Sequence, residues 1–334
     1  MSSTDRPTEK RNTKHHLDGR TLTLGQLALG MMVFGSATPV SKLVAEAMPV
    51  FIGAGLRVLL GALVLAPFAW RARHALGRLD RRDWLLVGLI AVFGMFGFTV
   101  FMLLGMSLVS GVAGSVIMAT TPAVTAAAAI LLFGERPNWR KAAAIGLGVA
   151  GVVLLHATGD GPGAHAQSKP GWTTWPGSMV SATLLGSILV FAAVCCEALY
   201  TLLGRKVSRD SDPRLVAFLG AALSLPLFLP LALWQAGDFD FTGVDWRGWL
   251  ALGWYGAGTL ALGTLLWYNG VSRSKGSIAA GFMGLMPVSA LVLSYLLLGE
   301  AFKTVHLAGF AVVFAGVLLM SWEHARMAEH DNAS

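Results

Sequence analysis

One stretch of this chain occurs twice. The segment GVAGSVIMATTPAVTAAAAILLFGE at residues 111–135 is matched by GSIAAGFMGLMPVSALVLSYLLLGE at residues 276–300. Both copies begin with glycine, contain a proline at the same position and end with Gly-Glu. Duplicated sets of apolar helices are found in membrane proteins whose two halves enclose a common site. The repeat therefore predicts two related halves and directs attention to the surface where they meet.

Composition indicates that both halves lie in a membrane. Apolar residues make up 55% of the chain and charged residues 13%, which is outside the range of ordinary soluble domains. Because hydrocarbon offers backbone groups no hydrogen-bond partner, each apolar run is expected to be a helix. The prediction is an all-α membrane protein with ten transmembrane helices, at residues 21–41, 49–70, 84–134 (two spans), 142–156, 181–204, 215–234, 248–272, 276–299 and 304–322.

Basic residues indicate how the spans are oriented. With ten spans, most of the 25 Lys and Arg residues fall on one side, and the outer loops hold only Lys169, Arg247 and Lys303. The positive-inside rule then places both termini in the cytoplasm. The net charge of +7 thus reflects membrane topology, and no nucleic acid partner is expected.

Five helices in each half would insert the second half upside down relative to the first, so we expect two inverted five-helix repeats. The predicted parts are a disordered cytoplasmic tail, a first repeat, an outer linker rich in glycine and proline, a second repeat and a cytoplasmic tail. Their respective boundaries are 1–20, 21–158, 159–180, 181–322 and 323–334.

Several short elements accompany the duplication. They are Phe34-Gly35-Ser36, Pro49 followed by Arg57, the two Pro-to-Gly-Glu segments, and Trp267. With the repeat, they resemble the EamA-type transporters of the drug/metabolite transporter superfamily over residues 25–321. The resemblance implies a secondary transporter of the bacterial plasma (inner) membrane that moves small organic metabolites, such as amino acids or drug-like solutes, by alternating access. We expect an exporter.

Glu197 is the first candidate site residue. It lies near the middle of the sixth predicted span, where an ionisable group is costly and normally faces the bundle interior or a water-filled path. Burial favours the protonated carboxyl, which suits proton coupling. The alternative is a structural carboxyl that bonds to a neighbouring helix. Tyr200, three residues later, would extend a polar stripe on the same helix face.

Arg57 and Lys42 are the cationic candidates. Arg57 is expected about 12 Å below the outer surface, and its repeat position holds Ala221. A charge present in one half suits a substrate carboxylate or phosphate, although pairing with helix carbonyls or with Glu46 fits as well. Lys42 is expected about 15 Å outward of the first span's middle, too far for a salt bridge with Glu197. It either joins the site or snorkels to the headgroups.

The remaining candidates are polar or aromatic. Ser36 and Thr38 either line a solute cavity or bond back to their own helix. Trp267 and Tyr268, followed by Asn269, fit either an interfacial anchor or the wall of a binding site.

Three prolines and two glutamates mark helix breaks and ends. Pro39, Pro122 and Pro287 are expected to break helices inside spans, either along the solute path or as packing kinks. Glu135 and Glu300 are expected to begin the helix that follows each one, with a coupling role as the alternative.

Several classes of function are disfavoured by missing motifs. No GxxxxGK[ST] is present, so ATP is not expected to drive transport, and no HExxH or GxSxG suggests an enzyme. We expect no cofactor and no metal; the expected partners are a small-molecule solute and the lipid bilayer, and the sequence sets no oligomeric state. A channel or a non-transporting membrane scaffold is the alternative function.

Overall fold

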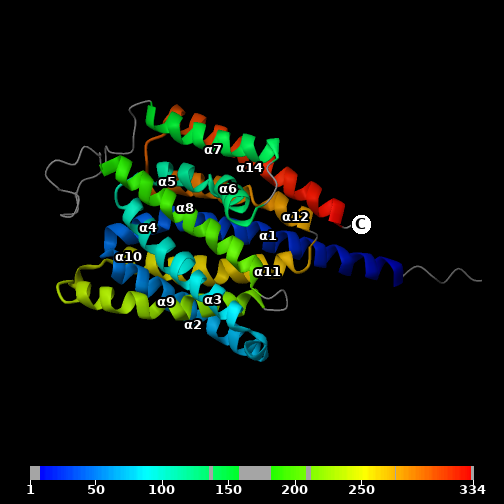
Figure 1. Cartoon of the computed structure of the whole chain (residues 1–334), viewed down its shortest axis with the longest axis horizontal. Helices are drawn as coiled ribbons and strands as arrows, with labels where there is room; N and C mark the ends of the chain where they lie inside the picture. The colour runs from blue at the N-terminus through cyan, green and yellow to red at the C-terminus, as the bar shows by residue number, and fades with distance from the viewer. Residues whose placement is uncertain (1–7, 135–137, 158–181, 208–211, 275, 332–334) are drawn as a thin grey trace, which may run out of the picture.

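The chain folds into a bundle of helices (Figure 1). This computed structural model describes residues 8–134, 138–157, 182–207, 212–274 and 276–331, and no strand occurs in these ranges. The helices of the first half are α1 (Thr8–Ala47), α2 (Val50–Arg71), α3 (Arg81–Leu89), η2 (Ile90–Gly97), α4 (Phe98–Met106), α5 (Gly111–Met118), α6 (Thr121–Phe133) and α7 (Trp139–Ala157). Those of the second half are α8 (Ala182–Lys206), α9 (Pro213–Ala236), α10 (Trp246–Gly253), η5 (Trp254–Leu262), α11 (Gly263–Val271), α12 (Gly276–Phe282), α13 (Leu285–Leu298) and α14 (Thr304–Asp331).

Eight helical segments within the described residues are long and apolar enough to cross a membrane. They are Thr21–Ala47, Val50–Arg71, Arg81–Met106, Gly111–Leu132, Ala182–Gly204, Pro213–Ala236, Trp246–Val271 and Thr304–Trp322. Two of the ten predicted spans are not among these segments. The fifth, at 142–156, corresponds to α7. The ninth is divided between α12 and α13, and each of these is too short to cross alone. The prediction of an all-helical membrane protein is confirmed.

The two halves repeat the same order of elements. In each half the third segment has a π-helical middle, η2 between α3 and α4, and η5 between α10 and α11. In each half the fourth segment is broken in two, α5 and α6 or α12 and α13. Because π-helical turns are rare, their recurrence at matching places extends the sequence repeat to the backbone.

The prolines of the repeat stand at the start of the second half-helix. Pro122 lies in the first turn of α6, and Pro287 in the first turn of α13. Proline suits a first helical turn because the N–H that it lacks has no partner there. Pro39 differs, since it lies inside the continuous α1. Each broken segment ends at a glycine with a left-handed φ, 66° at Gly134 and 62° at Gly299.

Helices from the two halves interlock. α1 packs against α13, α11 and η5 of the second half, and α8 packs against α4, α6 and η2 of the first half. We call α1 with α10, η5, α11, α12 and α13 the α1 bundle, and α8 with α3, η2, α4, α5 and α6 the α8 bundle. At opposite edges of the molecule α2 packs on α9 and α7 packs on α14 (Figure 1).

The helices at the ends of the chain extend past the predicted membrane boundaries. α1 is helical from Thr8, and α14 continues to Asp331. Helix is therefore present over residues 8–20 and 323–331, where cytoplasmic tails are predicted. Residues with high helix propensity, such as Lys and Glu, allow a helix to continue beyond its apolar part. The predicted linker at 159–180 lies outside the described residues.

Candidate functional site

Glu197 of α8 lies against the break between α5 and α6. The Thr121 hydroxyl, in the first turn of α6, is 3.0 Å from Glu197 Oε2 and 2.7 Å from the carbonyl oxygen of Met118, the last residue of α5. A hydroxyl has a single proton to donate, so Thr121 can donate to only one of these two acceptors. The Glu197 side chain is thus held at a helix break in the interior, and it is partly exposed there.

Arg57 of α2 is buried without an ion-pair partner. Its residue is 5% exposed, and Nη1 donates a hydrogen bond to Oγ1 of Thr99 in α4. The guanidinium carbon lies 4.1 Å from the ring centre of Tyr255 and 5.4 Å from that of Phe98. Nε has no hydrogen-bond partner, and no carboxylate of the described residues lies within 4.0 Å of the guanidinium. The expected alternatives for Arg57, helix carbonyls or Glu46, are therefore not its partners.

Arg57 and Glu197 interact through space without forming an ion pair. Each contributes to the electrostatic environment of the other. Within the described part of the chain, Glu197 is the carboxylate that acts on Arg57 in this way. The structure thus brings the first two predicted candidates into one electrostatic neighbourhood, with Tyr255 beside Arg57.

Tyr255 was missed by the sequence reasoning. It lies in η5, is 0% exposed, and supplies the aromatic face on which Arg57 rests. Phe98 and Thr99, which also contact Arg57, were missed as well. A weak signal was available for Tyr255, because the chain has four tyrosines and this one falls inside a predicted span.

Two tyrosines that the sequence analysis singled out as site candidates lie next to each other. The side chains of Tyr200 in α8 and Tyr268 in α11 lie close enough to interact, across the two bundles. Tyr200 packs closely over Gly94 of η2, where an added Cβ would lie 2.9 Å from the tyrosine Cβ. Tyr268 thus lies beside the helix that carries Glu197, and its role as a binding-site wall or as an interfacial anchor stays a prediction.

Trp267 and Asn269, the neighbours of Tyr268, contact adjacent helices. The backbone of Trp267 lies against Gly30 of α1, where an added Cβ would be 3.0 Å from the Trp267 nitrogen. The Asn269 side-chain oxygen accepts a hydrogen bond from Nη2 of Arg214 in α9. These contacts fasten α11 to its neighbours on both sides.

Ser36 and Thr38 are buried in α1. Ser36 Oγ donates to the carbonyl oxygen of Val33 at 2.6 Å, as helix back-bonding predicts, and accepts from Nε1 of Trp254 at 2.8 Å. Thr38 is 3% exposed, and its carbonyl oxygen accepts from the Ser41 hydroxyl at 2.7 Å. Ser36 therefore links α1 to η5, and no hydrogen bond joins either residue to the Arg57 or Glu197 side chains in the described part of the chain.

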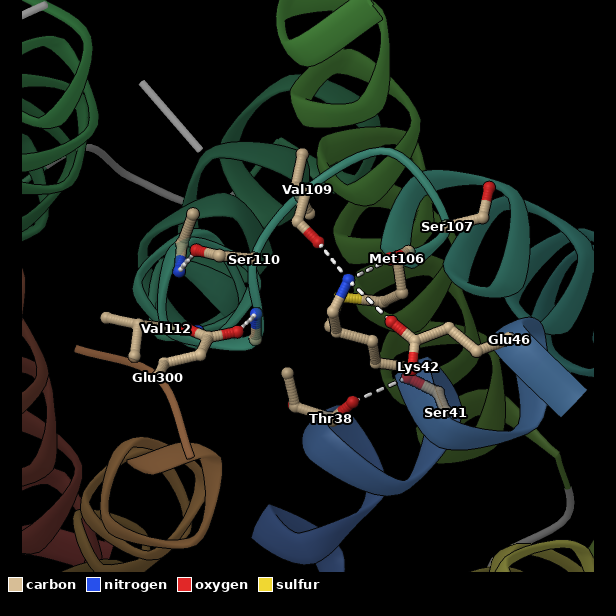
Figure 2. A network of polar contacts seen from close by, with 12 residues as sticks. Thr38, Ser41, Lys42, Glu46, Met106, Ser107, Val109, Ser110, Val112 and Glu300 are labelled. Carbon is tan, nitrogen blue, oxygen red and sulfur yellow. Dashed lines mark hydrogen bonds and ion pairs between the residues drawn. The ribbon is translucent and has the colours of Figure 1, made fainter. Parts of the chain in front are cut away.

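Lys42 does not snorkel. Its side chain is 13% exposed and forms an ion pair of 3.2 Å with Glu46. Nζ also donates to the carbonyl oxygens of Val109 at 2.8 Å and Met106 at 3.3 Å, at the end of α4 (Figure 2). As expected, Lys42 makes no salt bridge with Glu197. The lysine is instead bound to the turn between α4 and α5.

Glu300 corrects another expectation. It precedes α14, which begins at Thr304, and its carboxylate accepts hydrogen bonds from the backbone nitrogens of Gly111 and Val112, the latter at 3.0 Å (Figure 2). The left-handed Gly299 ends α13 and turns the chain, so that Glu300 reaches the unpaired N–H groups that begin α5. Its repeat counterpart Glu135 lies outside the described residues.

These features define a class of protein: a helical membrane protein with charged and aromatic groups in its interior. Residues 22–157 and 184–322 match the model of the EamA-like transporter family. The chain therefore belongs to this family, within the drug/metabolite transporter superfamily, and the resemblance seen in the sequence is confirmed.

Named proteins that resemble this chain are also described as transporters. The chain is 29% identical to the uncharacterized transporter YetK of Bacillus subtilis (strain 168) over 88% of this chain and 84% of YetK. It is 26% identical to a probable terminal-alkyne amino-acid exporter of Streptantibioticus cattleyicolor, over 72% of this chain and 74% of that protein. A crystal structure with 17% identity has a TM-score of 0.56 and covers 92% of this chain and 98% of its own, which supports the fold. Family and relatives are transporters rather than enzymes.

Proposed function

We propose that this chain is a secondary transporter that exports small amino-acid-like solutes by alternating access. In this proposal it lies in a bacterial inner membrane, crosses it ten times as two inverted five-helix repeats at 21–158 and 181–322, and has both termini in the cytoplasm. The observation that carries the proposal is Arg57, a buried guanidinium that lacks an ion-pair partner in the described part of the chain.

The contacts between helices support the inverted topology. Positive-inside orientation assigns the end of the first span, the turn after α4 and the loop after α13 to the outer side. Lys42 binds the carbonyl oxygen of Val109, and Glu300 binds the nitrogen of Gly111, so these three outer ends are indeed neighbours. A parallel arrangement of the halves would place Glu300 on the opposite side from Gly111.

Arg57 is suited to bind the carboxylate of the solute. Removing a charge from water is costly unless a partner compensates it, and the aromatic faces of Tyr255 and Phe98 compensate only in part. A guanidinium presents a planar fork of donors that matches a carboxylate. The free Nε leaves Arg57 with a donor to offer.

Glu197 is suited to bind the ammonium group, in competition with a proton. Both short contacts of the Thr121 hydroxyl are satisfied together when Glu197 carries the proton, because the carboxyl then donates to Thr121 while Thr121 donates to Met118. An ionised Glu197 would instead accept from a cation. A zwitterion between Arg57 and Glu197 would therefore displace the proton, and this competition couples export of the solute to entry of a proton.

The name of one relative agrees with this solute class, since the Streptantibioticus cattleyicolor protein is described as a probable amino-acid exporter. Tyr200, Tyr268, Trp267, Ser36, Thr38 and Lys42 remain candidates of the proposal. Of these, Tyr200 and Tyr268 are the best placed, because Tyr200 interacts electrostatically with Glu197 and Tyr268 lies beside Tyr200.

Ligand-dependent thermal stability tests the binding step. A bound solute raises the unfolding temperature of the native state, so purified protein would be heated with a panel of amino acids, the matching amines without a carboxylate, and the matching acids without an amine. We expect stabilisation only by compounds with both groups, lost in Arg57→Lys and Glu197→Gln and kept in Glu46→Gln, whose carboxylate is exposed and pairs with Lys42. Equal stabilisation by amines and amino acids would overturn the role of Arg57.

A further inference from the structure

The two ends of the molecule are packed differently. At the end that carries the α4–α5 turn (Ser107–Ser110), α5 packs against α13 and α1, and α4 packs against α1. The repeat-equivalent pairs are α12 with α6, α12 with α8 and α11 with α8, and none of them makes extensive backbone contact among the described residues. The α1 bundle and the α8 bundle are thus closed against each other at the α4–α5 turn and are further apart at the other end.

Two charged side chains of the α1 bundle hold the closed end. Lys42 comes from α1, and its ammonium binds the carbonyl oxygen of Met106, the last residue of α4, and that of Val109 in the turn that follows (Figure 2). Glu300 follows α13, and its carboxylate binds the nitrogens of Gly111 and Val112, where α5 begins. Because a helix is negative at its C-terminus and positive at its N-terminus, each charge meets the helix end of opposite sign.

We propose that Lys42 and Glu300 form a latch that closes the outer end of the transporter and releases the α4–α5 turn in each transport cycle. The proposal rests on the proposed function for the cycle itself. The latch joins one bundle to the other, so the bonds must break before the bundles can separate at this end. The turn keeps its own internal bonds when released, since Ser110 Oγ accepts from the Ala113 nitrogen at 3.1 Å and Ser107 Oγ donates to Leu104 at 2.7 Å.

The interface beneath the latch is built to part and close again. The Ser115 and Ser294 hydroxyls lie 3.0 Å apart, and each lies 2.8 Å from a carbonyl oxygen of its own helix, that of Gly111 and of Ala290 respectively. Each hydroxyl has one proton, so when the helices part, each can donate to its own carbonyl. Separation therefore leaves neither hydroxyl without a partner.

The repeat supplies a counterpart for Lys42 at the other end. Lys206, which ends α8, occupies the equivalent position, and it is exposed where Lys42 is largely buried. This difference matches the difference in packing between the two ends. When the bundles close at the other end and open at the latch, Lys206 would approach the end of α11 as Lys42 approaches the end of α4.

Thiol labelling tests the latch without any solute. Val109 is 1% exposed in the closed end, so a Val109→Cys side chain reacts with a water-soluble maleimide only when the latch opens. The protein would be held in lipid nanodiscs, which expose both faces, and the labelling of the native Cys195 and Cys196 would be measured in the parent chain and subtracted. We expect Lys42→Met and Glu300→Gln each to speed labelling about tenfold, because each loses charge-assisted hydrogen bonds.

Matched variants decide the outcome. Glu46→Gln should label less than about twofold faster, because the Glu46 carboxylate touches Lys42 but not the turn. Should a latch variant fail to insert, Lys42→Arg and Glu300→Asp keep the charges, and both should label slowly. If Lys42→Met and Glu300→Gln label at the same rate as the Val109→Cys protein with Lys42 and Glu300 intact, the proposal is overturned. Faster labelling in a protein that transports nothing would leave the latch standing and overturn the proposed function instead.

Discussion

Glu300 caps the helix that begins at Gly111. The last residue of the repeated segment 276–300 is thus bonded to the first residue of its counterpart, 111–135. The contact depends on the absence of a side chain, since a Cβ at Gly111 would overlap Leu298 and lie 3.2 Å from Glu300 Oε1. The glycine that begins the repeat and the glutamate that ends it thus serve one joint between the halves.

Gly111→Ala should therefore weaken the closed end. The added methyl group forces Leu298 and the Glu300 carboxylate away, and overpacking of this kind costs about 1–3 kcal/mol. Thermal unfolding of the purified protein measures the loss, and Val109→Cys in this background should label faster. Gly146→Ala is the matched control, because nothing lies within 4 Å of a Cβ there, and its effect should stay within about 1 kcal/mol. Equal stability of the two variants would contradict the tight contact.

Gly94→Ala should disturb the tyrosine pair. An added Cβ at Gly94 would press on the ring of Tyr200, with contacts of 2.9 and 3.0 Å to its Cβ and Cγ, and would push its hydroxyl away from Tyr268. We expect the solute flux to fall about tenfold at normal membrane abundance, the equivalent of about 1.4 kcal/mol. Gly88→Ala, in the same membrane-spanning segment with open space around it, should transport as the parent does. Comparable flux in both variants would remove Tyr200 from the site.

Arg57→Lys should raise the KM for a solute with a carboxylate more than it lowers the maximal rate. Lysine keeps the charge but loses the planar fork and its stacking on Tyr255, a loss of about 1.5–3 kcal/mol for a charged hydrogen bond, or roughly tenfold to hundredfold in KM. Initial rates over a range of solute concentrations separate the two quantities. A fall in maximal rate with unchanged KM would assign Arg57 to the helix movement rather than to the solute.

Glu197→Gln should remove the dependence of transport on pH. Glutamine keeps a group that can bond to Thr121, but it carries no charge for the ammonium group and cannot exchange a proton. Solute binding should therefore weaken, and the exchange that remains at high solute concentration should not depend on pH. Counterflow of labelled against unlabelled solute at several pH values, with equal pH on both sides, measures this. Parallel pH profiles in the variant and the parent would assign the coupling to another group.

Much of the fold could be predicted because apolar runs and the internal repeat are properties of the sequence alone. The expected interior placement of Arg57 and Glu197 held, since hydrocarbon disfavours an exposed charge. The side chains that contact these two residues could not be predicted. Tyr255 approaches Arg57 through the packing of η5 on α2, which leaves no local pattern.

Lys42 and Glu300 show a second limit of sequence reasoning. Local rules favour snorkelling for a lysine near a span end and a first-turn position for a glutamate before a helix. Both residues instead bind backbone groups of the α4–α5 turn, which lies far away in the sequence. Tertiary contact between the halves outweighed the local preference at both positions.

The most direct test of the central claim is the flux of labelled amino acids in liposomes with and without a pH gradient, for the parent, Arg57→Lys, Glu197→Gln and the control Glu46→Gln. At solute concentrations below the KM of the parent, the account predicts that a gradient drives solute movement opposite to proton movement in the parent and in Glu46→Gln. It predicts no response in Glu197→Gln at any concentration, and in Arg57→Lys a response only at much higher solute concentrations. Gradient-driven flux of the same size in Arg57→Lys and Glu197→Gln would contradict the assignment of these two residues as the solute and proton site.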